Sequence, residues 1–284
     1  MSRILITGSA DGLGLMAAQL LIGEGHEVVL HARNARRASD ANAAAPGAAG
    51  VLTGDLSSIE EMRSVARQAN ETGPFDAVIH NVAVGYREHR KITTADGLSH
   101  VFAINVLAPY LLTALITPPR RLVHLSSGMH RSGDPDLSDL QWEKRAWIPA
   151  QAYADSKLHD VLLAFAIARH WPQVLSNAVT PGWVPTKMGG PGAPDDLSQA
   201  HLTQAWLAVS GEPAATVSGA YFYHKAQADT HPAARDPDLQ DGLLAACAEL
   251  TGTPCRARTR PGDQVRRAAR PRCAPPSAAR TTTR

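Results

Sequence analysis

The sequence predicts an α/β protein with a doubly wound parallel sheet of seven strands in a single domain. Short apolar runs alternate along the chain with longer amphipathic stretches, as strands alternate with helices in such sheets. The apolar runs are continuous, which is typical of strands buried on both faces of a parallel sheet. A glycine-rich turn follows the first run, at the edge where doubly wound sheets bind ligands.

Seven apolar runs are predicted to be strands, and Val, Ile and Leu dominate the first five. They are Arg3–Thr7, Glu27–Ala32, Val51–Thr53, Ala77–Asn81, Arg121–Ser126, Ser176–Val179 and Ala220–Tyr223. Helices are expected at Leu13–Glu24, Ser57–Asn70, Ala95–Leu115, Gln151–His170, Leu197–Ser210 and Pro237–Thr251. Because crossovers between parallel strands are right-handed in nearly all proteins, this alternation builds one twisted sheet with helices on both faces.

Composition limits the classes of protein that this chain can belong to. It has 284 residues, a formal net charge of +2 and 44% hydrophobic residues, which is enough for a sizeable core. No apolar run is long enough to cross a membrane, and the apolar start at 4–6 is too short for a secretory signal. The cysteines lie late in the chain, at Cys247, Cys255 and Cys273, so no disulfide framework is expected. We therefore expect a cytoplasmic protein without a membrane partner.

Residues 253–284 differ in composition from the rest of the chain. They hold nine arginines and one aspartate, a net charge of +8, so residues 1–252 carry −6. With five prolines and only Val265 as a large aliphatic residue, this segment cannot bury enough apolar surface to offset its ordering entropy. We therefore place one domain at 1–252 and predict a disordered tail at 253–284. A basic tail can bind nucleic acid, but an incidental extension is the simpler interpretation, and nucleic acid is not an expected partner.

The first predicted strand runs into Thr7-Gly8-Ser9-Ala10-Asp11-Gly12-Leu13-Gly14 and then into a helix. Glycines at this place allow a tight turn, close approach of a pyrophosphate and close packing of the helix on the strand. The N–H groups and the dipole at the start of the helix favour phosphate oxygens. We therefore predict a dinucleotide cofactor site, with contacts from Gly8, Ser9, Asp11, Gly12, Leu13 and Gly14.

The residues after the second strand bear on the identity of the cofactor. An NAD site usually has a carboxylate here for the ribose 2′-hydroxyl, but no Asp or Glu stands between His31 and Ser39. Arg33 instead offers a guanidinium that can pair with a 2′-phosphate. The sequence therefore favours NADP(H) as the cofactor. Further contacts are expected where the third and fourth strands end, from Asp55, Leu56, Asn81, Val82 and Ala83.

A second motif, Tyr153-Ala154-Asp155-Ser156-Lys157, lies within a predicted long helix. Its i, i+4 spacing puts Tyr153 and Lys157 on one helical face. A tyrosine with its ordinary pKa of about 10 is a poor acid–base catalyst at neutral pH. A neighbouring ammonium group favours the phenolate and lowers that pKa, which is the physical reason for pairing the two residues.

Together these motifs resemble the short-chain dehydrogenase/reductase family in its compact, NADP-preferring form. Over about residues 3–252 the matching positions keep the order of the family: the 7–14 turn, Asp55, the Asn81 segment, Asn105, Ser127, Tyr153 with Lys157, and the 181–186 segment. The resemblance implies a Rossmann fold and an oxidoreductase that transfers a hydride between NADPH and a ketone or aldehyde, as a carbonyl reductase or alcohol dehydrogenase. In relatives, the helices that match 95–115 and 151–170 make subunit interfaces, so a homo-oligomer, a dimer or a tetramer, is expected.

The resemblance also implies a role for each matching residue. Tyr153 would be the general acid/base at the substrate oxygen, Lys157 would lower its pKa and hold the nicotinamide ribose, and Ser127 would polarise the carbonyl. Asn105 would hold a water that resupplies protons. The nicotinamide end of the cofactor would meet Tyr153, Lys157, Pro181, Gly182, Val184 and Thr186.

Two departures from the family pattern concern the rim of the site. The usual Asn-Asn-Ala-Gly segment reads Asn81-Val82-Ala83-Val84 here. Ser127 and Tyr153 are 26 residues apart, a longer gap than in the smallest members, and the intervening 134–143 segment resembles an insertion of the retinol-dehydrogenase-like branch. Because that insertion lies near the substrate mouth, it indicates a sizeable or apolar small-molecule carbonyl substrate.

Other functions find less support in the sequence. The twelve histidines form no His-Glu-x-x-His pattern and the cysteines no paired Cys-x-x-Cys, so no metal is expected. A Gly-x-Ser-x-Gly elbow is also missing, which disfavours a serine hydrolase. Two alternatives stay open: a non-catalytic NADP-binding sensor that engages a partner through the basic tail, and an isomerase or dehydratase that keeps its cofactor bound. Residues 183–194 are expected to form a lid over the substrate.

Overall fold

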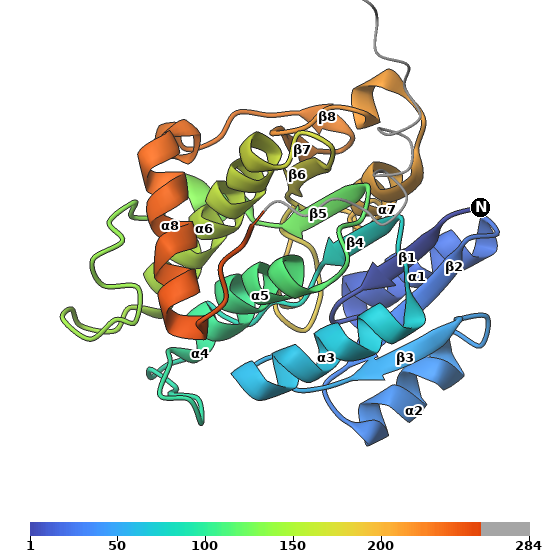
Figure 1. Ribbon diagram of the computed structural model, residues 1–284, viewed down its shortest axis with the longest axis horizontal. Helices are drawn as coiled ribbons and strands as arrows, with labels where there is room; N and C mark the ends of the chain where they lie inside the picture. Colours follow the sequence, from blue (N-terminus) through green and yellow to red (C-terminus); the bar gives the residue numbers. More distant parts are fainter. Residues whose placement is uncertain (257–284) are drawn as a thin grey trace, which may run out of the picture.

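The computed structural model of the protein describes residues 1–256. Its strands form one sheet in the order β3-β2-β1-β4-β5-β6-β7-β8 (Figure 1). These are β1 (Arg3–Ile6), β2 (Glu27–Ala32), β3 (Gly50–Thr53), β4 (Ala77–His80), β5 (Arg121–Leu125), β6 (Leu175–Val179), β7 (Tyr221–Tyr223) and β8 (Ala226–Gln227). The strand order reverses at β1, which lies between β2 and β4. The crevice beyond the carboxyl ends of these strands is therefore where a ligand is expected.

All seven predicted strands form, and the neighbouring pairs among them are parallel. The predicted fold class is thus confirmed. The strand count was wrong by one, because β8 pairs antiparallel with β7 at the edge of the sheet. A tight turn joins the two strands, with His224 and Lys225 at φ of +48° and +62°. Since β8 is only two residues long and exposed, no apolar run marks it in the sequence.

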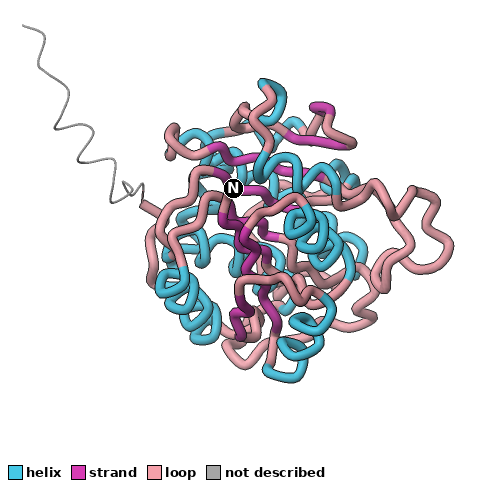
Figure 2. Tube along the Cα trace, turned by 90° about the vertical axis from the view of Figure 1, so that its right-hand side faces the viewer, coloured by secondary structure: helices cyan, strands magenta, loops and turns pink. Residues whose placement is uncertain are grey.

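Helices cover both faces of the sheet, and Figure 2 shows the strands running between them. On one side lie α1 (Gly12–Gly23), α2 (Ala35–Ala44) and α7 (Leu202–Val209), and on the other α3 (Ile59–Thr72), α5 (Ala108–Leu115), α6 (Pro149–His170) and α8 (Pro237–Thr251). Strands β1 to β7 contribute side chains to both cores; in β1, for example, Ile4 and Ile6 belong to the first core and Leu5 to the second. The continuous apolar runs of the sequence follow from this two-sided burial.

Two helices begin later than predicted, and a third helix was not predicted. The helix expected at 95–115 begins only at α4 (His100–Phe102) and continues through a π-helical turn, η1 (Ala103–Leu107), into α5. The helix expected at 197–210 begins at Leu202, because 197–201 form turns. α2 was not predicted at all, since Ala41 is its one buried residue and the helix has no apolar stripe.

Most of the predicted tail lies outside the described residues, which end at Arg256. Its first residues follow α8 and contact α5: the Tyr110 hydroxyl donates to the Thr253 carbonyl at 2.7 Å and accepts from the Cys255 N–H at 3.1 Å. In the described part of the chain, no helix is long and apolar enough to cross a membrane.

Four histidines are buried among the strands and α6: His31, His80, His124 and His159. Burial lowers the pKa of His31 and of His159 to about 4 and that of His80 to about 3. Burial also lowers the pKa of His124 well below its ordinary value, and His80 and Lys157 add to this effect. The folded state therefore keeps these rings neutral.

The free energy of unfolding is expected to fall as the pH drops from 6.5 towards 4, because the unfolded chain then binds protons that the folded chain excludes. A shift from 6.5 to about 4 corresponds to about 3 kcal/mol for each of His31 and His159. Asp160, whose pKa burial raises to about 6, opposes one such contribution. Urea denaturation between pH 7.5 and 4.5 measures the slope. His159→Leu should reduce it and the exposed His89→Gln should not; a flat profile for the parent chain would contradict the prediction.

Candidate active site

A glycine turn lies between β1 and α1, at the carboxyl edge of the sheet. Gly8 and Gly12 have φ of +63° and +54°, a conformation that L side chains rarely adopt. Gly14 is required for another reason: a Cβ there would meet the Gly8 carbonyl oxygen at 2.6 Å and also the Asn81 side-chain amide. The Asp11 side chain does not cap α1, so the first N–H groups of this helix stay open to a ligand.

Two buried side chains fix the shape of this turn. The Gly8 N–H donates to His31 Nδ1 at 3.1 Å, and Nε2 of the same ring lies 2.9 Å from the Gly54 carbonyl oxygen. The neutral ring therefore carries its proton on Nε2. The Ser9 hydroxyl donates to the Ile6 carbonyl and accepts from the His31 N–H, so it is engaged inside the fold. Sequence reasoning missed His31 because a single histidine in an apolar strand matches no motif.

The predicted residues after β4 contact the glycine turn, and those after β3 are bound within their own loop and the core. Asn81 donates from Nδ2 to the carbonyls of Thr7 and Gly8, at 3.0 and 3.1 Å. The next residue, Val82, lies directly under Gly8, where a Cβ would meet its Cα at 2.9 Å. Leu56 is buried in the core against α3, and Asp55 accepts the Ser57 N–H. The Asn81 and Leu56 side chains are thus committed to the fold, and Ala83 lies half-buried beside them.

Basic residues flank the turn at the end of β2. Arg33, predicted from the sequence, is exposed, and no ion pair involves it within residues 1–256. Arg37, which the sequence analysis missed, pairs with Asp11 at 2.8 Å and donates to the Ala10 carbonyl at 3.3 Å. The Asn34 side chain accepts the Arg37 N–H and thereby caps α2. Recognising Arg37 would have required predicting α2.

A cleft of about 660 Å³ opens at the same edge of the sheet. Several elements contribute to its wall, including the glycine turn, the end of β5, α6 and the segment after β6. The predicted site residues that line it are Leu13, Ser127, Tyr153, Pro181, Gly182, Val184 and Thr186. Asn105 and Lys157 are both 1% exposed and lie behind this wall.

Tyr153 stands on the wall of the cleft, where the Ser127 hydroxyl lies close enough to the phenol to lower its pKa. Its ring centroid lies 5.6 Å from that of Tyr86. Gly85 leaves room for the ring, since a Cβ at this glycine would meet Tyr153 Cε2 at 2.8 Å. Burial raises the pKa of Tyr153; the Lys157 ammonium lowers it, and the Asp160 carboxylate raises it again. Lys157 thus shifts the pKa of Tyr153 in the expected direction, but burial outweighs it, so the net pKa is raised and the phenol stays neutral.

Lys157 is buried with a carboxylate partner that the sequence analysis did not single out. Its Nζ donates to Asp160 Oδ2 at 2.7 Å and to the Leu125 carbonyl at 2.9 Å, and it lies 5.6 Å from the centre of the Tyr153 ring. Burial lowers the pKa of Lys157, but the Asp160 carboxylate outweighs this and the pKa is raised. The lysine is therefore charged and paired.

Asn105 lies in the π-helical turn and joins two parts of the site. Its Oδ1 accepts the Val84 N–H, while Nδ2 donates to the Val84 carbonyl and to Ser156 Oγ, each at 2.9 Å. The amide thus ties the loop after β4 to α6, next to Lys157. π-helical turns often mark functional positions.

The segment predicted to be a lid lies along the cleft and is held at several points. The Tyr86 hydroxyl donates to the Met188 carbonyl at 2.7 Å, and Trp183 Nε1 donates to the Gly189 carbonyl at 3.1 Å. Lys187 forms an ion pair with Asp11 of the glycine turn at 2.7 Å. These contacts connect the segment to both sides of the cleft.

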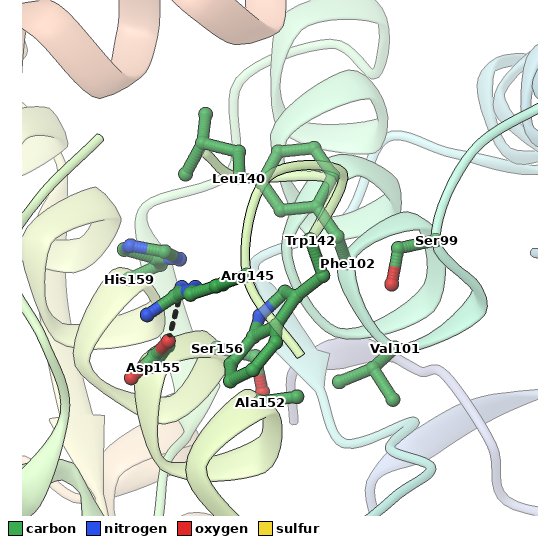
Figure 3. A pocket seen from close by; sticks show the side chains of 10 residues that line it. All are labelled: Ser99, Val101, Phe102, Leu140, Trp142, Arg145, Ala152, Asp155, Ser156 and His159. Carbon is green, nitrogen blue, oxygen red and sulfur yellow. Dashed lines mark hydrogen bonds and ion pairs between the residues drawn. The ribbon is translucent and has the colours of Figure 1, made fainter. Parts of the chain in front are cut away.

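The segment between Ser127 and α6 is anchored by one arginine (Figure 3). Arg145 pairs with Asp155 of α6 at 2.7 Å and with Asp134 at 3.3 Å, and its guanidinium lies 3.8 Å from the centre of the Trp142 ring. Asp155 is buried, and its neighbour Tyr153 lies on the cleft wall. The inserted segment and the site thus share α6 as their support.

Comparisons with known proteins identify the family. A family model described as short chain dehydrogenase matches residues 2–129. An uncharacterized oxidoreductase of Emericella nidulans, AN7799, is 44% identical over 256 residues, which cover 89% of this chain and 98% of the relative. The chain belongs to the short-chain dehydrogenase family. The family predicted from the sequence motifs is therefore confirmed, and the chain is an oxidoreductase of this type.

Further relatives belong to the same family, and one solved structure shares the fold. Short-chain dehydrogenase chry4 of Gibberella zeae is 42% identical, covering 89% of this chain and 98% of its own. Retinol dehydrogenase 13 of Homo sapiens is 30% identical, covering 88% and 84%. A crystal structure of an uncharacterized protein from Mycobacterium Paratuberculosis matches with a TM-score of 0.77 at 24% identity, over 90% of this chain and 95% of that one. Its likeness concerns the fold.

Removing the Arg145 guanidinium is expected to destabilise this short-chain dehydrogenase, because Asp155 would keep its charge in a buried place without a cationic partner. Arg145→Met should cost about 2–3 kcal/mol, since Gln151 still donates to Asp155. That corresponds to roughly 6 °C in Tm. The matched control is Arg120→Met, which removes an exposed pair with Asp76 at 3.9 Å and should cost under about 0.5 kcal/mol. Equal thermal shifts for both variants would contradict the assignment of Arg145 as an anchor.

Proposed function

We propose that the protein is an NADP-dependent carbonyl reductase, which also runs as an alcohol dehydrogenase in reverse. One observation carries the proposal: the hydroxyl groups of Ser127 and Tyr153 lie together on the wall of a cleft that begins at an uncapped, glycine-lined helix start. Such a pair of hydroxyls can bind and protonate one carbonyl oxygen. The alternative of a sensor depends on tail residues outside the described part, and nothing within residues 1–256 favours it.

The glycine turn fits the pyrophosphate of a dinucleotide. Gly14 lets the start of α1 pack closely on the turn, because a Cβ there would collide with the Gly8 carbonyl oxygen, and no side chain caps the first N–H groups of α1. Arg33, with its exposed guanidinium at the end of β2, would hold a 2′-phosphate, and Arg37 would add positive charge beside it. Pro181, Gly182, Val184 and Thr186 would meet the nicotinamide end, with Asp55, Leu56, Asn81, Val82 and Ala83 along the sheet edge. A blue fluorescent protein with 20% identity and a TM-score of 0.63 was solved in complex with NADPH.

In the reduction, the residues of this chain position the carbonyl and deliver a proton. NADPH, when bound, supplies the hydride for the carbonyl carbon. Ser127 donates a hydrogen bond to the carbonyl oxygen, and Tyr153 transfers its phenol proton to that oxygen as the alcohol forms. Lys157 would hold the ribose of the cofactor beside Tyr153. Asn105, which joins the loop after β4 to α6, would hold a water that resupplies protons. Tyr153 must be protonated for this direction, which agrees with its raised pKa.

Tyr153→Phe removes the proposed acid and is expected to lower kcat for NADPH-dependent reduction by at least about 100-fold, within the range for loss of general acid catalysis. NADPH oxidation followed by absorbance, with a panel of aldehydes, ketones, quinones and steroids, measures this. Tyr110→Phe is the matched control, because its hydroxyl contacts the Thr253 carbonyl away from the cleft. Near-native reduction by Tyr153→Phe would refute the proposed role.

Arg33→Ser is expected to weaken NADPH binding by roughly 10- to 100-fold and to leave NADH binding almost unchanged, because only NADPH carries the 2′-phosphate. Arg36→Ser is the control, since Arg36 is an exposed arginine on the same segment. Dissociation constants from fluorescence titration distinguish the cofactors. An equal loss for NADH and NADPH would argue against a phosphate contact at Arg33.

Asp160→Asn removes a carboxylate that raises the pKa of Tyr153 and leaves the Lys157 ammonium without its counter-charge. Because reduction needs the protonated phenol, its rate is expected to decline with rising pH from a lower pH than in the parent enzyme. The pH profile of kcat/KM between pH 7 and 11 measures this shift. Asp155→Asn, which breaks a buried pair with Arg145 on the same helix, should leave the profile in place. An unchanged profile for Asp160→Asn would contradict the coupling.

A further inference from the structure

The wall of the cleft has an unusual composition for this chain. Only 5% of all residues are aromatic, yet four of the five tyrosines line this one cleft: Tyr86, Tyr153, Tyr221 and Tyr223. They come from the loop after β4, from α6 and from β7, so three separate parts of the fold converge here. Trp183 and the thioethers of Met129 and Met188 complete an apolar surface. Flat rings and polarisable sulfur atoms favour an aromatic ligand.

Several of these rings have fixed positions, which suits a wall of defined shape. The Tyr86 hydroxyl donates to the Met188 carbonyl at 2.7 Å, and its ring is tilted by 59° against that of Tyr153. Tyr221 is 2% exposed, with its ring centroid 4.4 Å from that of His130. Tyr153 alone has a proposed part in the chemistry, so the other tyrosines are available to shape the pocket for a substrate ring.

One cation stands on the same wall without an acidic partner. Arg131 lies in the short helix η2 (Gly128–Ser132), four residues after Ser127. Its Nη2 donates to the Asp229 carbonyl at 3.1 Å, and among the described residues it has no ion pair with a carboxylate. A guanidinium has five N–H donors, so most of them are left for a ligand.

The acidic residue on the cleft wall forms no ion pair with Arg131. Asp195 belongs to the segment after β6, and its carboxylate accepts the Trp183 N–H at 2.6 Å. Lys187, at the mouth of the cleft, is already paired with Asp11. The region beside Ser127 therefore combines aromatic rings with one guanidinium that forms no ion pair among the described residues.

We propose that the natural substrate is an aromatic aldehyde or ketone that carries a carboxylate. Its ring lies against the tyrosine wall, its carbonyl faces Ser127 and Tyr153, and its carboxylate is bound by Arg131. A 3₁₀ rise of about 2 Å per residue separates the backbone positions of Ser127 and Arg131 by about 8 Å along the helix axis, and both side chains line the same cleft. This inference rests on the proposed carbonyl reductase function and adds the class of substrate to it.

Two pairs of aldehydes test the inference with the full chain and NADPH. 4-Formylbenzoate and its methyl ester differ in charge, and the ester has the more electrophilic aldehyde, so a preference for the acid cannot come from carbonyl reactivity. 4-Formylcyclohexanecarboxylate keeps the charge without the aromatic ring. We expect kcat/KM for 4-formylbenzoate to exceed both others by at least about tenfold, which is the size of one charge-assisted contact. In Arg131→Gln the preference for the acid over the ester should collapse to about twofold or less. Tyr223→Leu should reduce the preference for the aromatic over the cyclohexane acid.

The controls separate failure of this inference from failure of the proposed function. Arg67→Gln changes an exposed arginine of α3 and should keep both preferences. Reduction of the ester and of the acid at equal rates, or a preference for the acid that survives in Arg131→Gln, would overturn the substrate class while leaving the reductase function standing. If wild-type protein binds NADPH but none of the three aldehydes, nor any carbonyl of the broader panel, causes its oxidation, both proposals fail.

Discussion

A fully buried ammonium group constrains the centre of this structure. An isolated cation in such a place would cost several kcal/mol, so the fold must supply partners for Lys157 on every side. Asp160 gives the opposite charge from the same helix, and the Leu125 carbonyl gives a second acceptor from the end of β5. Ser126 then donates to the Lys157 carbonyl at 2.7 Å. The position of α6 against β5, and with it the position of Tyr153, follows from satisfying this one charge.

Helix α6 supports both the proposed catalytic residues and the segments around the mouth of the site. Tyr153 faces the cleft, Ser156 receives the Asn105 amide, and Asp155 holds the inserted segment through Arg145. Side chains of α6 that are separated by one or two positions therefore serve the reaction, the loop after β4 and the mouth of the site. A single long and almost wholly buried helix allows this, because its neighbours cannot move independently of one another.

The sequence predicted the parts of the structure that depend on local pattern. Buried strands such as Glu27–Ala32 are continuous apolar runs, and the glycine turn and the Tyr153–Lys157 pair have fixed spacings, so all were visible. The pairing of Lys157 with Asp160 was not visible, because the i, i+3 spacing also occurs on exposed helix faces, as in Arg37–Asp40, and the sequence does not show that this pair is buried. His31 and Arg37 reach the glycine turn from other elements, and their contacts depend on tertiary placement. The π-helical turn and the two-residue β8 are also too short to leave a periodic signal.

The ion pair between Lys187 and Asp11 joins the segment after β6 to the glycine turn, and its exposure to solvent limits how much it stabilises that contact. The Lys187 side chain is 86% exposed, and pairs of this kind contribute at most about 1 kcal/mol and are screened by salt. The hydrogen bonds from Tyr86 and Trp183 to the backbone at Met188 and Gly189 are uncharged and partly buried. Salt therefore weakens the ion pair more than these hydrogen bonds, and the contact between the segment after β6 and the loop after β4 is the one that persists at high ionic strength.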